Sequence, residues 1–149
     1  MSRWHLAQVN VGTLVGPEGD PRVQAFFDQL DTVNAIAEGS LGFVWRLKGE
    51  GNNATDINPT PDPRFVLNIS LWESVEALMA FAYRSGHAGV LAKRGSWFEP
   101  HAANHMALWW VPAGHLPTME SGLARLWLLD RHGPTAEAFT FRTRFGPPA

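Results

Sequence analysis

Asn68 and Trp72 are the residues whose type and spacing first indicate a ligand site. They lie in residues 65–72, where apolar residues alternate with a mixed set, as in a strand. Side chains alternate between the two faces of a strand, so Asn68 and Trp72 share one face with Val66 and Ser70. A polar side chain beside an aromatic one is typical of a small-molecule pocket. A hydrated interface, or a hydrogen bond from Asn68 to the backbone, is the alternative explanation, because a buried amide needs a partner.

Basic side chains elsewhere in the chain could complete such a site. His87 can take up or release a proton near neutral pH, as a general base does. The guanidinium groups of Arg46 and Arg94 offer a fixed fork of donors to a carboxylate or an enolate. We therefore predict His87 and Asn68 as catalytic residues, with the two arginines as substrate contacts. A histidine that hydrogen-bonds a helix end, and arginines at the surface or in an interface, are the simpler explanations.

Aromatic residues are abundant for a chain of 149 residues. There are seven tryptophans and nine phenylalanines but one tyrosine. Trp72 and Trp97 are predicted to provide flat apolar walls for a bound molecule. The alternative is a tryptophan-rich core and dimer interface, in which both indoles serve ordinary packing.

Several classes of chemistry are excluded by what the sequence lacks. There is no cysteine, which removes disulfides, thiolate nucleophiles and cysteine-ligated metal sites. His101 and His105 have the i, i+4 spacing of a metal pair, but no acidic third ligand is near. Neither a glycine-rich phosphate loop nor a Gly-x-Ser-x-Gly motif occurs. The sequence therefore predicts neither a metal nor a cofactor.

The charge pattern argues against nucleic-acid and membrane partners. The formal net charge is −2, without a run of Lys or Arg, whereas a nucleic acid or an anionic membrane needs a basic face. The longest apolar run, residues 106–111, is far too short to span a bilayer. The N-terminus lacks the apolar core of a signal peptide. We expect a cytoplasmic protein whose partner is a small hydrophobic molecule.

Hydrophobic periodicity predicts the elements that would position these residues. Four strands are predicted, at residues 3–11, 41–48, 65–72 and 104–111. Helices are predicted at residues 20–39, 74–85, 87–94 and 118–133. The first begins at Asp20-Pro21, an N-cap acceptor followed by a proline at the first helical position. Phe139, Phe141 and Phe145 alternate in a last run, which we interpret as a fifth strand or as an arm on a partner subunit. No repeat or linker is visible, so residues 1–149 are predicted to form a single domain.

The order of these elements matches the β-α-β-β-α-β unit of ferredoxin-like α+β proteins, with a helix and a strand appended. In that unit the helices cover one face of a four-stranded sheet, and we expect the apolar face of residues 65–72 beneath them. The other face would carry Trp4, Asn10, Asn68 and Trp72, too much aromatic surface to remain in water. Pairing of two sheets across a two-fold axis would bury it. We therefore predict a homodimer that forms a dimeric α+β barrel; a monomer whose sheet is capped by the C-terminal extension is the alternative.

Two sets of residues resemble known families. The segment from Leu71 to Phe81, followed by Ser85-Gly86-His87, resembles the antibiotic biosynthesis monooxygenase superfamily, in which a strand ends in Trp and a later helix carries His. The whole chain resembles an uncharacterised bacterial family of the same dimeric barrel type. The segments that carry this second resemblance are His5-Leu6-Ala7-Gln8, Gly42-Phe43-Val44-Trp45-Arg46-Leu47, Trp97-Phe98, Leu108-Trp109-Trp110-Val111-Pro112 and Pro117-Thr118-Met119-Glu120.

Two functional branches of that superfamily supply hypotheses. Cofactor-independent, quinone-forming oxygenases place Asn and Trp on one strand face, and Asn68 and Trp72 match that spacing. The resemblance implies that the polar side chain holds a phenolate-like substrate, which itself activates oxygen. Haem-degrading members use an Asn on the first strand, a Trp and a His ligand. Asn10, Trp72 and His87 are the matches, although the separation of Trp and His is longer here.

We therefore predict a small-molecule enzyme that acts on a hydrophobic aromatic or polyketide-like substrate. Cofactor-independent oxygenation is the favoured reaction, with cyclisation or isomerisation in the same pocket as a close variant. A non-catalytic ligand-binding or structural dimer, and a haem-binding or haem-degrading protein, are the alternatives. In the enzyme, His87 would shift protons and Asn68 would orient a substrate oxygen. The predicted substrate-binding residues are Asn10, Arg46, Trp72, Arg94 and Trp97.

Overall fold

The computed structural model describes residues 3–49, 58–85, 97–100 and 104–148. Within them, four strands form an antiparallel sheet in the order β2-β3-β1-β4. The strands are β1 Trp4–Thr13, β2 Phe43–Arg46, β3 Phe65–Trp72 and β4 Met106–Pro112. The helices are α1 Gln24–Glu38, which follows a 3₁₀ turn at Pro21–Val23, α2 Val75–Ser85 and α4 Met119–His132. The order β1-α1-β2-β3-α2-β4, with α4 appended, confirms the predicted ferredoxin-like α+β fold.

Local signals in the sequence explain where the helices begin and end. The carboxylate of Asp20 accepts a hydrogen bond from the backbone N–H of Arg22, which starts the 3₁₀ turn ahead of α1. Thr118 and Ser121 form a reciprocal capping box at the start of α4. Gly133 ends α4 with a φ of 72°, a backbone conformation that favours glycine.

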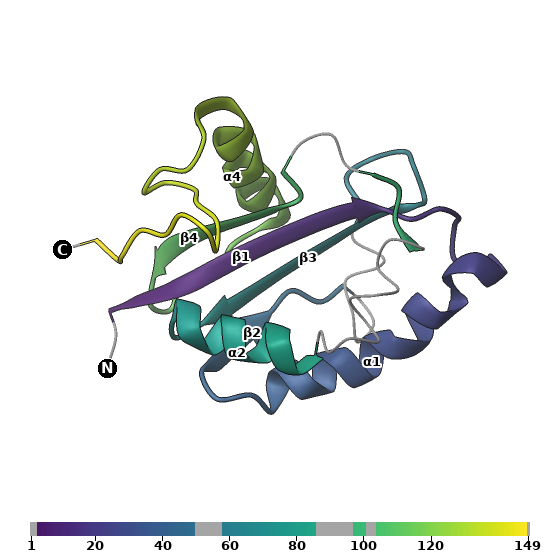
Figure 1. The fold of residues 1–149 in the computed structure, drawn as a ribbon, viewed down its shortest axis with the longest axis horizontal. Helices are drawn as coiled ribbons and strands as arrows, with labels where there is room; N and C mark the ends of the chain where they lie inside the picture. The colour runs from purple at the N-terminus through teal and green to yellow at the C-terminus, as the bar shows by residue number, and fades with distance from the viewer. Residues whose placement is uncertain (1–2, 50–57, 86–96, 101–103, 149) are drawn as a thin grey trace.

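The two faces of the sheet are covered by different helices. α1 and α2 lie on one side of the sheet and α4 lies on the other (Figure 1). The wholly apolar face packs against α4, and its buried residues from β1 and β3 are Ala7, Val9, Val11, Leu67, Ile69 and Leu71. The mixed face, with Asn10, Asn68 and Trp72, lies beneath α1 and α2. This corrects the prediction, which placed the apolar face of β3 under those two helices and left the mixed face uncovered. Alternation indicates that a strand face is buried, not which element buries it.

The covering of the mixed face removes much of the reason for which two sheets were predicted to pair. Of the aromatic surface from which the dimer was predicted, Trp72 is buried by α1, α2 and the C-terminal segment of the same chain, whereas Trp4 is half-buried. The appended helix α4 covers the opposite, apolar face, whereas the alternative arrangement expected the C-terminal extension to cap the mixed face. Dimerisation requires a second chain and stays a prediction.

The C-terminal segment packs on its own chain and makes a single bridge to β4. Phe139 and Leu108 exchange backbone hydrogen bonds of 2.8 and 2.9 Å. The chain then turns at residues 140–143 and leaves the strand direction. Trp110 Nε1 donates a 2.8 Å hydrogen bond to the carbonyl of Phe145, which holds the segment in place. The predicted fifth strand is therefore wrong, although its phenylalanines do face the core.

Two further expectations concern helices. The short helix predicted at residues 87–94 lies outside the described residues. Among the helices that are described, none is long and apolar enough to cross a membrane.

Candidate functional site

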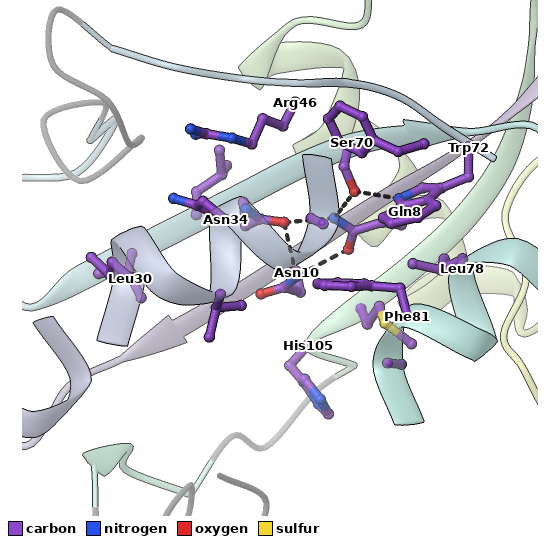
Figure 2. A pocket seen from close by; sticks show the side chains of 18 of the residues that line it. Gln8, Asn10, Leu30, Asn34, Arg46, Ser70, Trp72, Leu78, Phe81 and His105 are labelled. Atoms are coloured by element: carbon purple, nitrogen blue, oxygen red, sulfur yellow. Dashed lines mark hydrogen bonds between the residues drawn. The ribbon is translucent and has the colours of Figure 1, made fainter. Parts of the chain in front are cut away.

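A cavity lies between the mixed face of the sheet and helices α1 and α2 (Figure 2). Its volume of about 390 Å³ is within the range of roughly 300–1,000 Å³ that is usual for small-molecule sites. Most of the lining is apolar, with side chains from α1, α2 and the strands. The polar lining residues are Gln8, Asn10, Asn34, Arg46, Asn68, Ser70 and His105.

Three amides and one hydroxyl form a hydrogen-bonded strip on the sheet, and we call Gln8, Asn10, Asn68 and Ser70 the amide strip. The register of β1 and β3 sets Gln8 opposite Ser70 and Asn10 opposite Asn68. Gln8 Nε2 donates to Asn68 Oδ1 at 2.6 Å and to Ser70 Oγ at 2.8 Å. Asn10 Nδ2 donates to Gln8 Oε1 at 3.0 Å and, at 3.4 Å, to Asn68 Oδ1. The outer amide atoms, Oδ1 of Asn10 and Nδ2 of Asn68, bond to no other described residue, and both residues line the cavity.

Trp72 adjoins the amide strip and is completely buried. Its Nε1 donates a 2.8 Å hydrogen bond to Ser70 Oγ, which supplies the partner that a buried indole N–H requires. The ring stacks on Phe81 of α2, with centroids 5.0 Å apart, and meets Phe43 of β2 edge-on at 5.4 Å. The indole thereby joins the aromatic part of the lining to the strip.

Arg46 brings positive charge to the β2 side of the cavity. Its side chain is 3% exposed, and its Nε lies 3.2 Å from Glu38 Oε2 at the end of α1. Lys48 Nζ lies 3.7 Å from the same oxygen. A buried guanidinium needs such a counter-ion, because burying an unpaired charge is costly. Two cations therefore approach the same carboxylate oxygen at the end of α1.

The rest of the described lining is almost free of ionisable groups. His105, at the start of β4, is exposed, and it is the only ionisable side chain besides Arg46 among the described lining residues. Asn34 lines the cavity from α1 and is 9% exposed, and its amide makes no hydrogen bond within the described part of the chain. In that same part, no group of three or more His, Asp or Glu side chains could hold a metal ion. Recognition on this lining therefore relies on neutral amides and one buried cation.

The structure brings four of the predicted residues, Asn10, Arg46, Asn68 and Trp72, to one cavity. Two of them, Asn10 and Trp72, are also the matches to the haem-degrading pattern. The other predicted polar residues, His87 and Arg94, lie outside the described residues.

Trp97 was predicted as a wall of the pocket, but the structure places it away from the cavity. Its indole is 6% exposed and packs in a separate cluster with Leu14 and Val23. Its ring meets Phe26 at 5.8 Å in an edge-on contact. The residue does not line the cavity, because its indole is buried in this separate cluster.

Gln8, Ser70 and Asn34 were missed, although signals for them exist in the sequence. Gln8 lies two residues before Asn10, so alternation places both on one face of β1. The same rule places Ser70 between the side chains of Asn68 and Trp72. Asn34 interrupts the apolar stripe of α1, and burying a polar side chain there costs free energy unless it has a partner.

Solved structures with similar folds are distant in sequence. A protein of unknown function from Nitrosomonas europaea is 13% identical with a TM-score of 0.48, over 78% of this chain and 97% of that chain. SnoaB, a cofactor-independent oxygenase from Streptomyces nogalater, is 15% identical with a TM-score of 0.46, over 76% and 98%. A protein from Pseudomonas aeruginosa is 14% identical with a TM-score of 0.47, over 78% and 98%. No curated protein matches the sequence.

A family model matches nearly the whole chain. It covers residues 5–149 and is described as a domain of unknown function, DUF3291. The match confirms the predicted membership of an uncharacterised family. The chain belongs to the DUF3291 family.

Proposed function

We propose that the protein is an enzyme that binds a small, hydrophobic, oxygen-bearing ring compound in the cavity and oxygenates it without a cofactor. The observation that carries this proposal is the amide strip, a hydrogen-bonding surface on one side of a mostly apolar cavity. An apolar cavity with a few placed polar groups can orient a ligand and exclude water from it. The resemblance of Asn68 and Trp72 to the cofactor-independent oxygenases supports the reaction class.

Each part of the lining has a role in this proposal. Phe81 and Trp72 lie against the ring, and Asn68 donates to a ring oxygen. The guanidinium of Arg46, which lines the cavity, stabilises the enolate or phenolate form, which is electron-rich enough to reduce O₂ directly. In an anthrone, the methylene carbon loses two hydrogens and gains one oxygen atom as a carbonyl. The second oxygen atom leaves as water, so O₂ is the sole oxidant. Cyclisation or isomerisation of a related ring compound would use the same contacts.

The experiment measures O₂ uptake and quinone formation with 1,8-dihydroxyanthrone as the probe. Wild type is expected to exceed the rate of autoxidation in buffer. Asn68→Leu, close in size to asparagine but without an amide, should lower kcat/KM by about 10- to 100-fold, the effect of losing a hydrogen bond to a charged oxygen. Gln24→Leu is the matched control, because Gln24 is an amide on the exposed side of α1 that bonds Asp28. Its kcat/KM should equal that of wild type.

Two results would contradict the proposal. The first is a wild-type rate no higher than autoxidation. The second is an Asn68→Leu variant that is folded by circular dichroism and retains the full rate, since the strip would then have no part in the reaction.

A ligand-binding protein without chemistry is the second candidate. It is favoured by the scarcity of ionisable groups in the described lining, where Arg46 is paired with Glu38 and His105 is exposed. This candidate predicts saturable binding of 1,8-dihydroxyanthraquinone by calorimetry, with no O₂ uptake on the anthrone. Binding together with O₂ uptake would exclude it.

A further inference from the structure

We propose that the amide strip is a hydrogen-bond relay with two states, in which Asn68 presents either a donor or an acceptor to the ligand. The strip therefore selects compounds whose ring oxygen alternates between O–H and C=O. The inference rests on the proposed function, because it specifies what the same cavity binds. It starts from the donor and acceptor capacity of five side chains, Gln8, Asn10, Asn68, Ser70 and Trp72, which are linked in one network.

In the first state, Gln8 points its Nε2 at Ser70 Oγ and Asn68 Oδ1, and its Oε1 accepts from Asn10 Nδ2. The outer atoms of the two asparagines are then an Nδ2 on Asn68, which donates, and an Oδ1 on Asn10, which accepts. Trp72 Nε1 is a donor without acceptor capacity, so Ser70 Oγ accepts from it. The hydroxyl proton of Ser70 takes no part in the strip in this state.

In the second state, the three side-chain amides are each rotated by half a turn, which exchanges the positions of their oxygen and nitrogen atoms. Every contact between heavy atoms is retained. Gln8 Oε1 now accepts from the hydroxyl of Ser70 and from Asn68 Nδ2, and Gln8 Nε2 donates to Asn10 Oδ1. Trp72 Nε1 still donates to Ser70 Oγ, because a hydroxyl can donate and accept together. The outer atoms are exchanged: Asn68 presents an acceptor and Asn10 a donor.

The amides must turn together. If Gln8 turned alone, its oxygen would meet Asn68 Oδ1 across the present 2.6 Å contact, and its NH₂ would meet Asn10 Nδ2 across the 3.0 Å contact. Both contacts would be repulsive, which couples the three side chains. Within the described residues no charged side chain bonds to the strip, so the two states differ in hydrogen bonding by the proton of Ser70 alone.

The consequence concerns the ligand. A phenol or enol donates its O–H, whereas a ketone, quinone or phenolate accepts. A fixed amide at Asn68 would suit one form and reject the other, since an unmatched buried polar group is costly. The relay lets Asn68 match both forms at the same position. We therefore assign the cavity to hydroxyaromatic and quinone pairs rather than to ligands of one fixed polarity.

The test compares the binding of 1,4-dihydroxynaphthalene and 1,4-naphthoquinone by calorimetry under nitrogen, at about pH 6, where a phenol is neutral. Wild type should bind both with dissociation constants that agree within about threefold, a difference of less than one hydrogen bond. Gln8→Glu replaces the central amide by a carboxylate, which accepts only and so holds Asn68 with its Oδ1 toward the cavity. This variant should favour the dihydroxy compound over the quinone by at least about tenfold.

Asn10→Asp gives an independent measurement if Gln8→Glu does not fold. A carboxylate at position 10 requires Gln8 Nε2 as its donor, which turns Gln8 Oε1 toward Asn68 and predicts the same change of preference. Gln24→Glu is the matched control for added charge, and its two dissociation constants should keep the wild-type ratio.

The outcomes separate the relay from the proposed function. If wild type binds neither compound, the proposed binding function fails and the relay fails with it. If wild type binds both, but Gln8→Glu and Asn10→Asp keep the wild-type ratio, the relay is wrong and the binding function stands. A wild type that prefers one compound by more than about 30-fold would also overturn the relay, because the strip would then be fixed in one state.

Discussion

β1 and β3 are paired in one register, yet their two faces are built in opposite ways. On the face under α4, Ala7 pairs with Leu71 and Val9 with Ile69, and all four side chains are at most 1% exposed. On the face under α1 and α2, Gln8 pairs with Ser70 and Asn10 with Asn68. The apolar pairs are buried by close packing, whereas the polar pairs hydrogen-bond to one another and line a cavity. The first face is filled by close packing, and the second lines the cavity that we propose as the ligand site.

The largest expected effect comes from moving an amide to the apolar face. Ile69→Asn would bury a polar group with no partner under α4, where Ile69 is fully buried. We expect a loss of roughly 3–5 kcal/mol in the free energy of unfolding, measured by urea denaturation. A loss below about 1 kcal/mol would show that this face tolerates polar groups, and the contrast between the faces would fail.

A smaller effect is expected at the closest approach of α4 to the sheet. A Cβ at Gly122 would lie 2.8 Å from Ile69 Cδ1 and 3.1 Å from Val9 Cγ2. Gly122→Val should therefore lower the free energy of unfolding by about 1–3 kcal/mol through overpacking. Ligand affinity of the folded variant should stay at the wild-type value, because the helix lies on the other side of the sheet. A variant that is destabilised and also loses affinity would mean that the two faces are coupled.

The converse substitution on the cavity face should change binding rather than stability. Among the described residues, Asn68 bonds only to neighbours in the strip, so Asn68→Leu should alter the free energy of unfolding by no more than about 1 kcal/mol. Urea denaturation and calorimetry with 1,4-dihydroxynaphthalene measure both quantities on one sample. An Asn68→Leu variant that unfolds at far lower urea would make the amide a structural residue.

The smallest effect concerns the start of the helix that covers the cavity. A hydrogen bond from the Arg22 side chain lowers the pKa of Asp20 from 3.8 to about 2. Because the folded pKa lies below the unfolded one, this stabilisation is complete above about pH 4 and is lost as the pH falls toward 2. The pair is at the surface, so the change in the melting temperature should be slight. Asp20→Asn keeps a capping side chain and should reduce the acid dependence over that interval. Identical pH profiles of Asp20→Asn and wild type would show that Asp20 contributes nothing to it.

The strands and helices could be predicted because their signals are local. Alternation located β1 and β3, and the caps at Asp20 and Thr118 located the starts of the turn before α1 and of α4. The partner of each face could not be predicted, because an apolar face is equally suited to any apolar helix. The alternation at residues 139–145 was misleading for a similar reason, since the segment buries its phenylalanines around a turn.

The candidate site was predicted in part. Asn68 and Trp72 were found because both lie on one strand, where the spacing alone determines their side. Gln8 is equally determined on β1, but its contact with Ser70 depends on the register between two strands 62 residues apart. The alternation in each strand specifies which face its side chains are on, but not which residue of β3 lies opposite Gln8. Trp97 shows the limit of residue type as a guide, because a tryptophan suits a core as well as a pocket.

We propose that the ligand binds to the face of the sheet that carries the amide strip. The most direct test is a titration of isotopically labelled protein with 1,4-dihydroxynaphthalene, followed by the side-chain amide resonances in nuclear magnetic resonance spectra. We expect saturable shifts of the amides of Gln8, Asn10 and Asn68, while the amide of Gln24, on the exposed side of α1, keeps its resonance. Saturable binding that leaves the three strip amides unchanged would contradict the proposal.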